Sequence, residues 1–264
     1  MTTPNFTKTL KSISNNEIVV PALRSALWKP NFKSFTVTVD GFEERPPDGW
    51  FHPSVHPLWP EPLLYIYLTD YERMIREPFD PSSTMAVTAG TFFHTFVQNV
   101  LVEENVLDRQ PVVCDCGKKH PERAEVYLVD EESRSRGHSD GVVHEGSAFE
   151  FKTMNPMKLG RVPKGEPTDA AVLDWFKTKC RDYYAQAQEY LRMSGRDRMI
   201  VVLLGLTYPF EMREIHVPFD RPHSFQVREK FMRVIQAVAD QQMPRCACGI
   251  NEKTCPARGV CWGD

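Results

Sequence analysis

Two short stretches of the sequence place charged side chains where a buried strand has no structural use for them. They are Gly137–Gly141, which contains Asp140, and Phe149–Thr153, which contains Glu150 and Lys152. The pattern predicts a β-hairpin with Asp140 on its first strand and Glu150 and Lys152 on one face of its second. Because an unpaired buried charge is costly, we interpret the two acids and the lysine as a functional site.

The two acids are the kind of ligand that a hard divalent cation such as Mg²⁺ or Mn²⁺ prefers. Hydrolysis of a phosphodiester needs an activated water, neutralisation of the developing charge and a stabilised leaving oxygen. Lys152, close to Glu150 in sequence, would orient or help to deprotonate that water. Each of these residues alone also fits a solvated charge pair, so the assignment depends on what accompanies them.

Helices are predicted on both sides of this hairpin. Apolar spacing over Phe92–Glu104 predicts a helix with His94 in its first turn, and spacing over Asp174–Met193 predicts another that carries Gln186 and Tyr190. Taken alone, His94 is more often a helix-start residue bonded to the backbone. Gln186 and Tyr190 alone would be one solvated and one half-buried position a turn apart.

The rest of the chain supplies further strands and helices around this pair. Strands are predicted at 34–39, 124–129, 199–206 and 211–217, helices at 63–68 and 224–241, and a basic loop at 158–169. The order predicts an α/β fold, a short central sheet flanked by helices. We divide the chain into a lead (1–50), a core (51–244) with a cysteine-containing insertion at 110–122, and a cysteine-rich tail (245–264).

Taken in order, four motifs resemble those of the RecB-like nucleases in the PD-(D/E)XK superfamily. They are Gly90–His94, Gly137–Asp140, Glu150–Lys152 and Gln186–Tyr190, on a helix, a hairpin, a strand and a helix. The resemblance covers roughly residues 50 to 264 and extends to CRISPR-associated RecB-like exonucleases and phage-encoded relatives. It implies a restriction-endonuclease-like core with a short mixed sheet. Ser139 stands where the proline of the superfamily name would be, as is frequent in RecB-like members.

The resemblance also implies a role for each motif residue. The metal ligands would be His94, Asp140, Glu150 and the backbone carbonyl of Phe151. The residues of the catalytic set would be Asp140, Glu150, Lys152, Gln186 and Tyr190. Within that set Lys152 is the catalytic lysine, and the last two residues position the substrate phosphate or the lysine.

The cysteines predict a second, structural metal site. Of the seven cysteines, four lie in the tail: Cys246, Cys248, Cys255 and Cys261. Related nucleases hold an iron–sulfur cluster with three tail cysteines and one upstream, but Trp59 stands about where that upstream cysteine would fall. Either the tail binds zinc or an iron–sulfur cluster by itself, or Cys114 and Cys116 join Cys246 and Cys248 in one site. Cys180, on an apolar helix stripe, is predicted to be a core residue.

Charge and composition restrict how a substrate would be held. The formal net charge is −3 and the pI near 6.3, so binding to nucleic acid depends on a local patch or a bound metal. The candidates for DNA binding are Lys158, Arg161 and Lys164, followed by Lys177, Lys179 and Arg181. The chain lacks the roughly 18 to 20 unbroken apolar residues of a membrane span and a signal-peptide pattern. We therefore expect no membrane partner and a cytoplasmic location in a bacterial or phage-infected cell.

These observations favour a Mg²⁺- or Mn²⁺-dependent DNA nuclease, with an exonuclease that acts on DNA ends or single strands as the preferred form. Its setting would be recombination, repair or phage replication, with recombination or replication proteins as partners. A structure-specific endonuclease on the same fold is one alternative. The other is a noncatalytic DNA-binding or assembly factor whose nuclease centre is idle.

Overall fold

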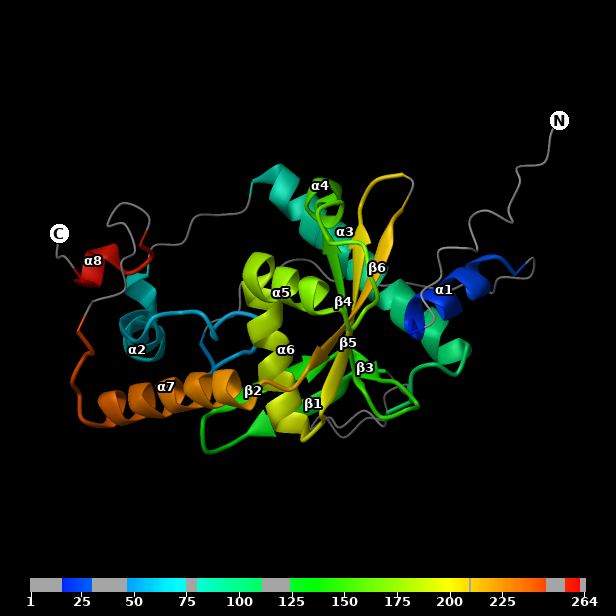
Figure 1. The fold of residues 1–264 in the computed structure, drawn as a ribbon. Coiled ribbons are helices and arrows are strands. Elements are labelled where there is room, and N and C mark those ends of the chain that lie inside the picture. The colour runs from blue at the N-terminus through cyan, green and yellow to red at the C-terminus, as the bar shows by residue number, and fades with distance from the viewer. Residues whose placement is uncertain are drawn as a thin grey trace, which may run out of the picture.

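A computed structural model describes residues 16–29, 47–74, 80–110, 124–208, 210–245 and 255–261 (Figure 1). The helices are α1 (Val19–Leu27), α2 (Glu61–Thr69), the short 3₁₀ helix η3 (Tyr71–Arg73), α3 (Pro81–Glu103), α4 (Pro156–Leu159), α5 (Ala170–Lys179), α6 (Arg181–Ser194), α7 (Arg221–Ala239) and α8 (Arg258–Cys261). The strands are β1 (Val126–Asp130), β2 (Ser135–Ser139), β3 (Gly141–Val142), β4 (Ala148–Met154), β5 (Arg198–Gly205) and β6 (Met212–Pro218).

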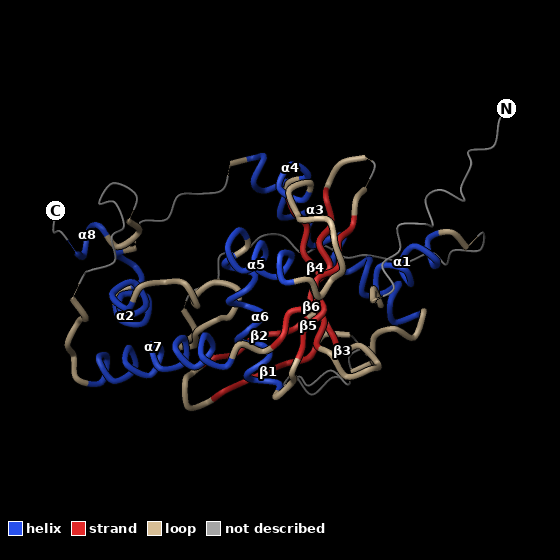
Figure 2. The backbone as a smooth tube through the Cα atoms, viewed as in Figure 1, coloured by secondary structure: helices blue, strands red, loops and turns tan. Residues whose placement is uncertain are grey.

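A mixed sheet lies at the centre of the molecule (Figure 2). Its strand order is β3-β4-β5-β6; β4 and β5 are parallel, and the two outer strands are antiparallel to their neighbours. The parallel pair is joined through α4, α5 and α6, as a parallel connection requires. Strands β1 and β2 form a separate antiparallel ribbon. The predicted α/β class, a mixed sheet flanked by helices, is confirmed.

Helices cover both faces of the sheet (Figure 1). On one face, α1 and α3 pack against Phe149 and Phe151 of β4 and against alternate residues of β5. On the other face, α5 and α6 pack against the residues of opposite parity, including Val201. Since side chains alternate along a strand, Glu150 and Lys152 point to the α6 face, away from the two phenylalanines.

A third layer of helices lies beyond α6. Helix α7 packs against both α2 and α6. The centre of this layer is the stacked pair Phe51 and Phe231, whose ring centroids are 4.3 Å apart. Lys230 of α7 donates hydrogen bonds to the carbonyls of Pro57 and Trp59, which ties the proline-rich segment before α2 to α7. This layer therefore supports α6 from outside.

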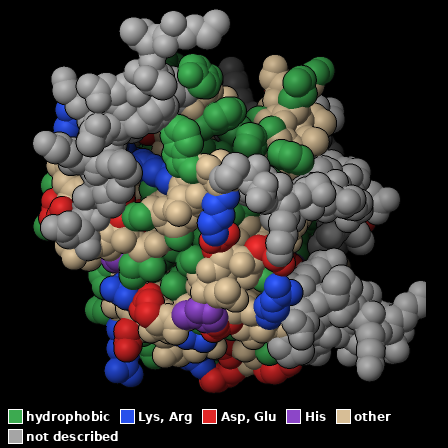
Figure 3. All heavy atoms as spheres, turned by 90° about the vertical axis from the view of Figure 1, so that its right-hand side faces the viewer, with side chains coloured by type: hydrophobic (Ala, Val, Ile, Leu, Met, Phe, Trp, Pro, Cys, Tyr) green, Lys and Arg blue, Asp and Glu red, His purple; other side chains and the backbone are tan. Residues whose placement is uncertain are grey.

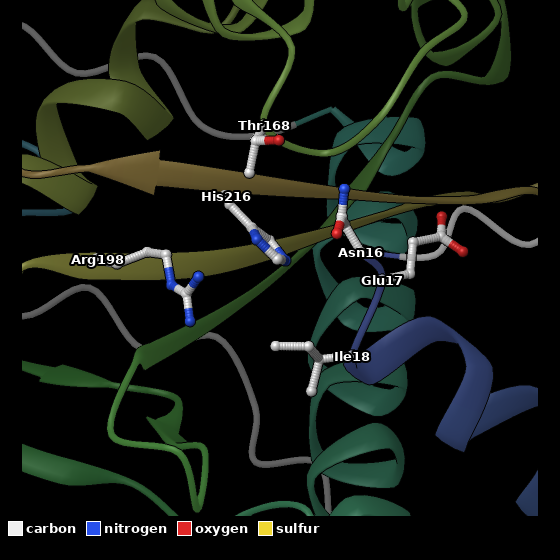
Figure 4. A pocket seen from close by; sticks show the side chains of 6 residues that line it. All are labelled: Asn16, Glu17, Ile18, Thr168, Arg198 and His216. Atoms are coloured by element: carbon white, nitrogen blue, oxygen red, sulfur yellow. The ribbon is translucent and has the colours of Figure 1, made fainter.

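The first helix is attached to the sheet edge by one carboxylate. Glu214 of β6 accepts hydrogen bonds from the backbone N–H groups of Ile18, Val19 and Val20 at 2.8–2.9 Å, and its Oε1 lies 2.7 Å from His216 Nε2. An acid at a helix N-terminus satisfies otherwise unpaired N–H groups. A polar pocket of about 350 Å³ lies beside this attachment (Figure 4). Its lining residues are Asn16, Glu17, Ile18, Thr168, Arg198 and His216.

Helix α3 begins earlier than predicted, at Pro81 and not near Phe92. The carboxylate of Asp80 accepts the N–H groups of Ser82 and Ser83 at 2.8 and 3.0 Å, and proline occupies the first helical position. This is a strong helix start that the prediction missed because the segment lacks apolar periodicity.

The helix predicted over Asp174–Met193 is two helices, α5 and α6. The chain leaves the helical conformation at Cys180, with φ −125° and ψ 47°. The thiol is buried, as predicted, but it lies at the corner between the helices. The predicted loop at 158–169 also differs, since α4 begins before it and Leu159 and Val162 are buried in the core.

By length and composition α3 also meets the criterion for a membrane-spanning helix, which a core helix can meet as well. Its second half is in the core through Val97, Val100 and Leu101. Its first half is exposed, including Met85 and Phe92. Hydrophobic side chains gather at the upper end of the face shown in Figure 3. The expectation of no membrane partner stays a prediction.

Candidate active site

Asp140 and Glu150 meet where β4 becomes the edge of the sheet. Strand β3 pairs only with Ala148 and Phe149, so within the described residues the rest of β4 has a neighbouring strand on one side alone. Asp140 lies in the bend between β2 and β3, and its Oδ2 accepts the N–H of Phe151 at 2.7 Å. Because the N–H and C=O of one strand residue point to the same side, the Phe151 carbonyl faces this edge too.

Glu150 is surrounded by the residues predicted to accompany it. Its Oε1 lies 2.7 Å from Lys152 Nζ and accepts a hydrogen bond from Gln186 Nε2 at 3.0 Å. Gln186 Nε2 also lies 3.3 Å from the hydroxyl oxygen of Tyr190. The Lys152 ammonium lies 5.5 Å from the centre of the Tyr183 ring, a contact that favours a cation. Helix α6 therefore holds the glutamate and the lysine in one orientation.

Helix α3 approaches the same acids from the other face of the sheet. His94 Nε2 lies 3.2 Å from Asp140 Oδ1. One turn later, the buried side chain of Gln98 donates to the Asp140 carbonyl at 2.8 Å. Gly90 allows the helix to come close to β4, since a β-carbon there would be 3.2 Å from the Thr153 hydroxyl. All four predicted motifs thus converge on one place.

Burial controls the electrostatics of this cluster. Burial raises the pKa of Asp140 to about 7, against the opposing effects of Lys152 and the Phe151 N–H. Burial and the neighbouring Asp140 likewise raise the pKa of Glu150 to about 7. For Lys152, burial is outweighed by Glu150 and Asp140, so the pKa of the ammonium is raised. The two acids and Lys152 therefore form one coupled group, in which a further cation would favour the ionised carboxylates.

The donor set fits a divalent cation. Among the described residues, two buried polar atoms at the site have no partner in hydrogen-bond geometry: Glu150 Oε2 and His94 Nε2, the latter despite its 3.2 Å approach to Asp140 Oδ1. Carboxylate and carbonyl oxygens suit Mg²⁺ and Mn²⁺, and imidazole suits transition metals. No three His, Cys, Asp or Glu side chains within the described ranges already form a metal cluster. Glu150 Oε1 and Asp140 Oδ2 also accept hydrogen bonds from protein donors, and a carboxylate oxygen can do this while it binds a cation.

Glu125 is a member of the site that the sequence analysis missed. Its Oε1 lies 3.9 Å from His94 Nε2, and it raises the pKa of Asp140. What places Glu125 at the site is the register of β1 with β2, which the sequence alone does not give. Val126 pairs with Ser139, so the preceding residue stands opposite Asp140. Gln98 was also missed, although it follows His94 by one helical turn and so shares its face.

Of the other predicted site residues, those that the structure describes do not join this cluster. Lys158, Arg161 and Lys164 are exposed, and Lys177 Nζ pairs with Asp220 at 2.9 Å. The DNA-binding role of the first three stays a prediction. Cys114, Cys116, Cys246 and Cys248 lie outside the described residues, as does the side chain of Cys261. Cys255 is a buried free thiol that packs beside Ala257. The predicted iron–sulfur or zinc site is therefore untested.

No protein-family model and no curated protein matches the chain significantly. Among solved structures, the alkaline exonuclease LHK-Exo from Laribacter hongkongensis is similar at 11% identity and a TM-score of 0.46, covering 73% of this chain and 89% of that one. Its complex with dAMP gives 13% identity, a TM-score of 0.42 and the same coverage. A protein described as SSO0001 gives 16% identity and a TM-score of 0.39, covering 92% and 93%. These similarities are too low to assign an activity.

Proposed function

We propose that the protein is a divalent-metal-dependent DNA nuclease, preferably an exonuclease that acts on DNA ends or single strands. The observation that carries this proposal is the buried group of Asp140, Glu150 and Lys152 at an open strand edge. Within the part of the chain that the structure describes, Glu150 keeps one oxygen without a hydrogen bond, and Lys152 Nζ lies 2.7 Å from the other oxygen. A purely structural ion pair at this depth would be expected to use all of its acceptors.

Each side chain has a role in hydrolysis of a phosphodiester. A cation held by Asp140, Glu150, His94 and the Phe151 carbonyl would supply Lewis-acid stabilisation and an acidified water. Lys152 places a positive charge beside the position where negative charge grows on the phosphate oxygens. Gln186, which bonds both Glu150 and Tyr190, keeps the glutamate oriented while its other oxygen faces the reacting groups.

Glu125 also belongs to this proposal. Its Oε1 lies 3.9 Å from His94 Nε2, and a third of its side chain is exposed. An acid there would hold a water or help to bind the cation as substrate arrives. The cellular setting we propose is DNA recombination, repair or phage replication in the cytoplasm, with the cysteine-rich tail binding iron–sulfur or zinc. Visible absorption by anaerobically purified protein would separate iron–sulfur from zinc.

The test of the nuclease proposal is cleavage of labelled linear single-stranded, linear double-stranded and circular DNA with Mg²⁺ or Mn²⁺. Wild-type protein is compared with Glu150→Ala and Lys152→Ala, and each variant is checked for folding by thermal unfolding. We expect loss of linear substrates from their ends by the wild type alone. Absence of any cleavage by the wild type, or full activity of both variants, would overturn the proposal. Cleavage of circular DNA would favour the endonuclease form.

A further inference from the structure

The β1–β2 ribbon has an outer face that bears aromatic and basic side chains. Its register pairs Tyr127 with His138 and Val129 with Arg136, and residues directly opposite each other share a face. Tyr127, Val129 and His138 are exposed. The Tyr127 and His138 rings lie 5.1 Å apart and are tilted by 41°. The inner face of the ribbon packs toward α6 instead.

This outer face continues directly into the candidate active site. The ladder ends at the Val126–Ser139 pair, and continuing its register by one residue puts Glu125 opposite Asp140. The position of His94, between the carboxylates of those two acids, places both on the same side of the ribbon. Successive pairs on one face are about 7 Å apart, because each strand residue rises about 3.4 Å. The aromatic pair therefore lies one such step from Asp140.

The segment before α2 adds a second wall beside the ribbon. The Arg136 guanidinium lies 5.2 Å from the centre of the Trp50 ring and 2.6 Å from Asp48 Oδ2. Asp48 also lies 3.1 Å from His52 Nε2, so this segment is fixed to the ribbon by side-chain contacts. Arg136 is held in place and keeps a third of its side chain exposed. The aromatic and guanidinium planes are thus preorganised.

We propose that the outer face of the ribbon binds the unpaired bases of the nucleic-acid strand whose phosphate enters the site, with Tyr127 and His138 as the stacking surface. Aromatic side chains stack any base, so such a surface tolerates different sequences. Arg136 is positioned to contact a base plane or a backbone phosphate. The direction of the strand toward Asp140 rests on the proposed nuclease function. The surface itself rests on the ribbon alone.

Binding is measured by fluorescence anisotropy with a short labelled oligothymidylate, in Mg²⁺ and in a Lys152→Ala background that prevents cleavage. Stacking on one aromatic side chain typically contributes enough that its removal weakens binding about 5- to 150-fold. We expect Tyr127→Ala to weaken binding within that range and Tyr127→Phe, which keeps the ring, to bind like the parent. Tyr208→Ala removes a tyrosine that is 90% exposed at a different place and serves as the matched control.

An oligonucleotide in which one base at a time is removed gives the second arm of the experiment. At the position that stacks on Tyr127, the missing base should weaken binding by the parent and have no further effect on Tyr127→Ala. Equal losses in both proteins at every position would overturn the proposal. An affinity of Tyr127→Ala within twofold of the parent would also overturn it. So would a changed oligomeric state of Tyr127→Ala without a change in DNA binding, which would identify the face as an interface between copies of the chain.

Cleavage by the otherwise wild-type chain is measured in parallel, with and without Tyr127→Ala. Tyr127-dependent binding without any cleavage by the wild type would refute the nuclease proposal and leave the stacking surface standing. Normal cleavage by the wild type, together with equal binding by wild type and Tyr127→Ala, would refute the stacking surface and leave the nuclease proposal standing.

Discussion

Two groups of buried charged side chains lie on either side of helix α6, and they differ in how fully the oxygens of their central glutamate are hydrogen-bonded. Toward β4, Glu150 shares one oxygen between Lys152 and Gln186, and its other oxygen has no hydrogen bond from any described residue. Toward β1 and α7, Glu189 has both oxygens occupied: Oε1 accepts from the Ser224 hydroxyl at 3.0 Å and Oε2 lies 2.9 Å from Arg192. Both glutamates are almost inaccessible to solvent.

The network around Glu189 has the character of a structural support. Arg192 also donates to Asp130 of β1, which in turn accepts from the Ser133 hydroxyl at 2.6 Å. These bonds join α6, the β1–β2 ribbon and α7, and each buried acceptor has a donor. Satisfied networks of this kind fix one arrangement of the surrounding elements. The cluster around Glu150, by contrast, keeps acceptor capacity that the fold does not use, which is what a binding site requires.

The largest contrast is expected in activity. Glu150→Gln should lower cleavage on the order of 10³-fold, a loss typical of removing one group that stabilises developing charge. The metal-free unfolding free energy should change by less than about 1 kcal/mol, because the amide still accepts from Lys152 and Gln186. Glu189→Gln is the paired control, which should lower the free energy of unfolding but keep the cleavage rate per folded molecule. Both quantities are measured for each variant, from initial cleavage rates and from denaturant unfolding. Loss of stability in Glu150→Gln together with loss of cleavage in Glu189→Gln would contradict the comparison.

The next effect is expected in stability. Glu189→Ala leaves the Arg192 charge buried with fewer acceptors, and breaking a buried pair in this way costs about 3 kcal/mol. Urea unfolding monitored by tryptophan fluorescence gives the difference. The double variant Glu189→Ala with Arg192→Met should recover part of the loss. A loss below about 1 kcal/mol in the single variant would show that the network contributes little.

His56 is a buried polar residue outside both networks, and it tests what burial of a titratable group does to stability. Burial lowers the pKa of His56 to about 3. The unfolded chain therefore binds a proton near the ordinary pKa of 6.5 while the folded chain does not, so His56 contributes a loss of stability as pH drops below about 6.5. Asp140 and Glu150, whose pKa values are raised, contribute a gain over the same range, so the His56 contribution is read from the difference between wild type and His56→Asn. Between pH 7 and 5 this difference should shift by about 2 kcal/mol in favour of the variant, and an unchanged difference would refute the assignment.

The smallest effect is expected from a neutral hydrogen bond. Gln98→Ala removes the donor to the Asp140 carbonyl, which should lower stability by about 1 kcal/mol. Cleavage should fall several-fold, since the bend that carries Asp140 loses a restraint. Gln236→Ala, which removes a glutamine bonded at an exposed helix position, is the matched control and should change neither quantity. If Gln98→Ala and Gln236→Ala had the same stability and the same cleavage rate, Gln98 would have no role at the site.

Much of the site was predictable because its residues recur at short spacings on regular elements. Strand alternation placed Glu150 and Lys152 on one face, and a helical turn placed Gln186 beside Tyr190. These relations are local, so one sequence was enough to find them. Their convergence on Asp140 came from the resemblance to a nuclease family and was beyond local rules.

What was missed depends on contacts between distant segments. Glu125 reaches the site only through the register of β1 with β2. The corner at Cys180 interrupts a sequence whose apolar spacing reads as one helix, and tertiary packing decides such a break. The start of α3 was signalled by Asp80 and Pro81, but an exposed helix has little apolar periodicity to support the signal.

The position of α6 has a practical consequence for attempts to shorten the chain. Every side chain from Tyr184 to Leu191 is buried, because the sheet, β1 and α7 surround the helix. A fragment that stopped after β6 would keep all four motifs. It would lose the hydrogen bond from Ser224 to Glu189 and expose one side of α6 to water. The smallest autonomous unit therefore extends through α7. Tags or fusions are better attached beyond it than in its place.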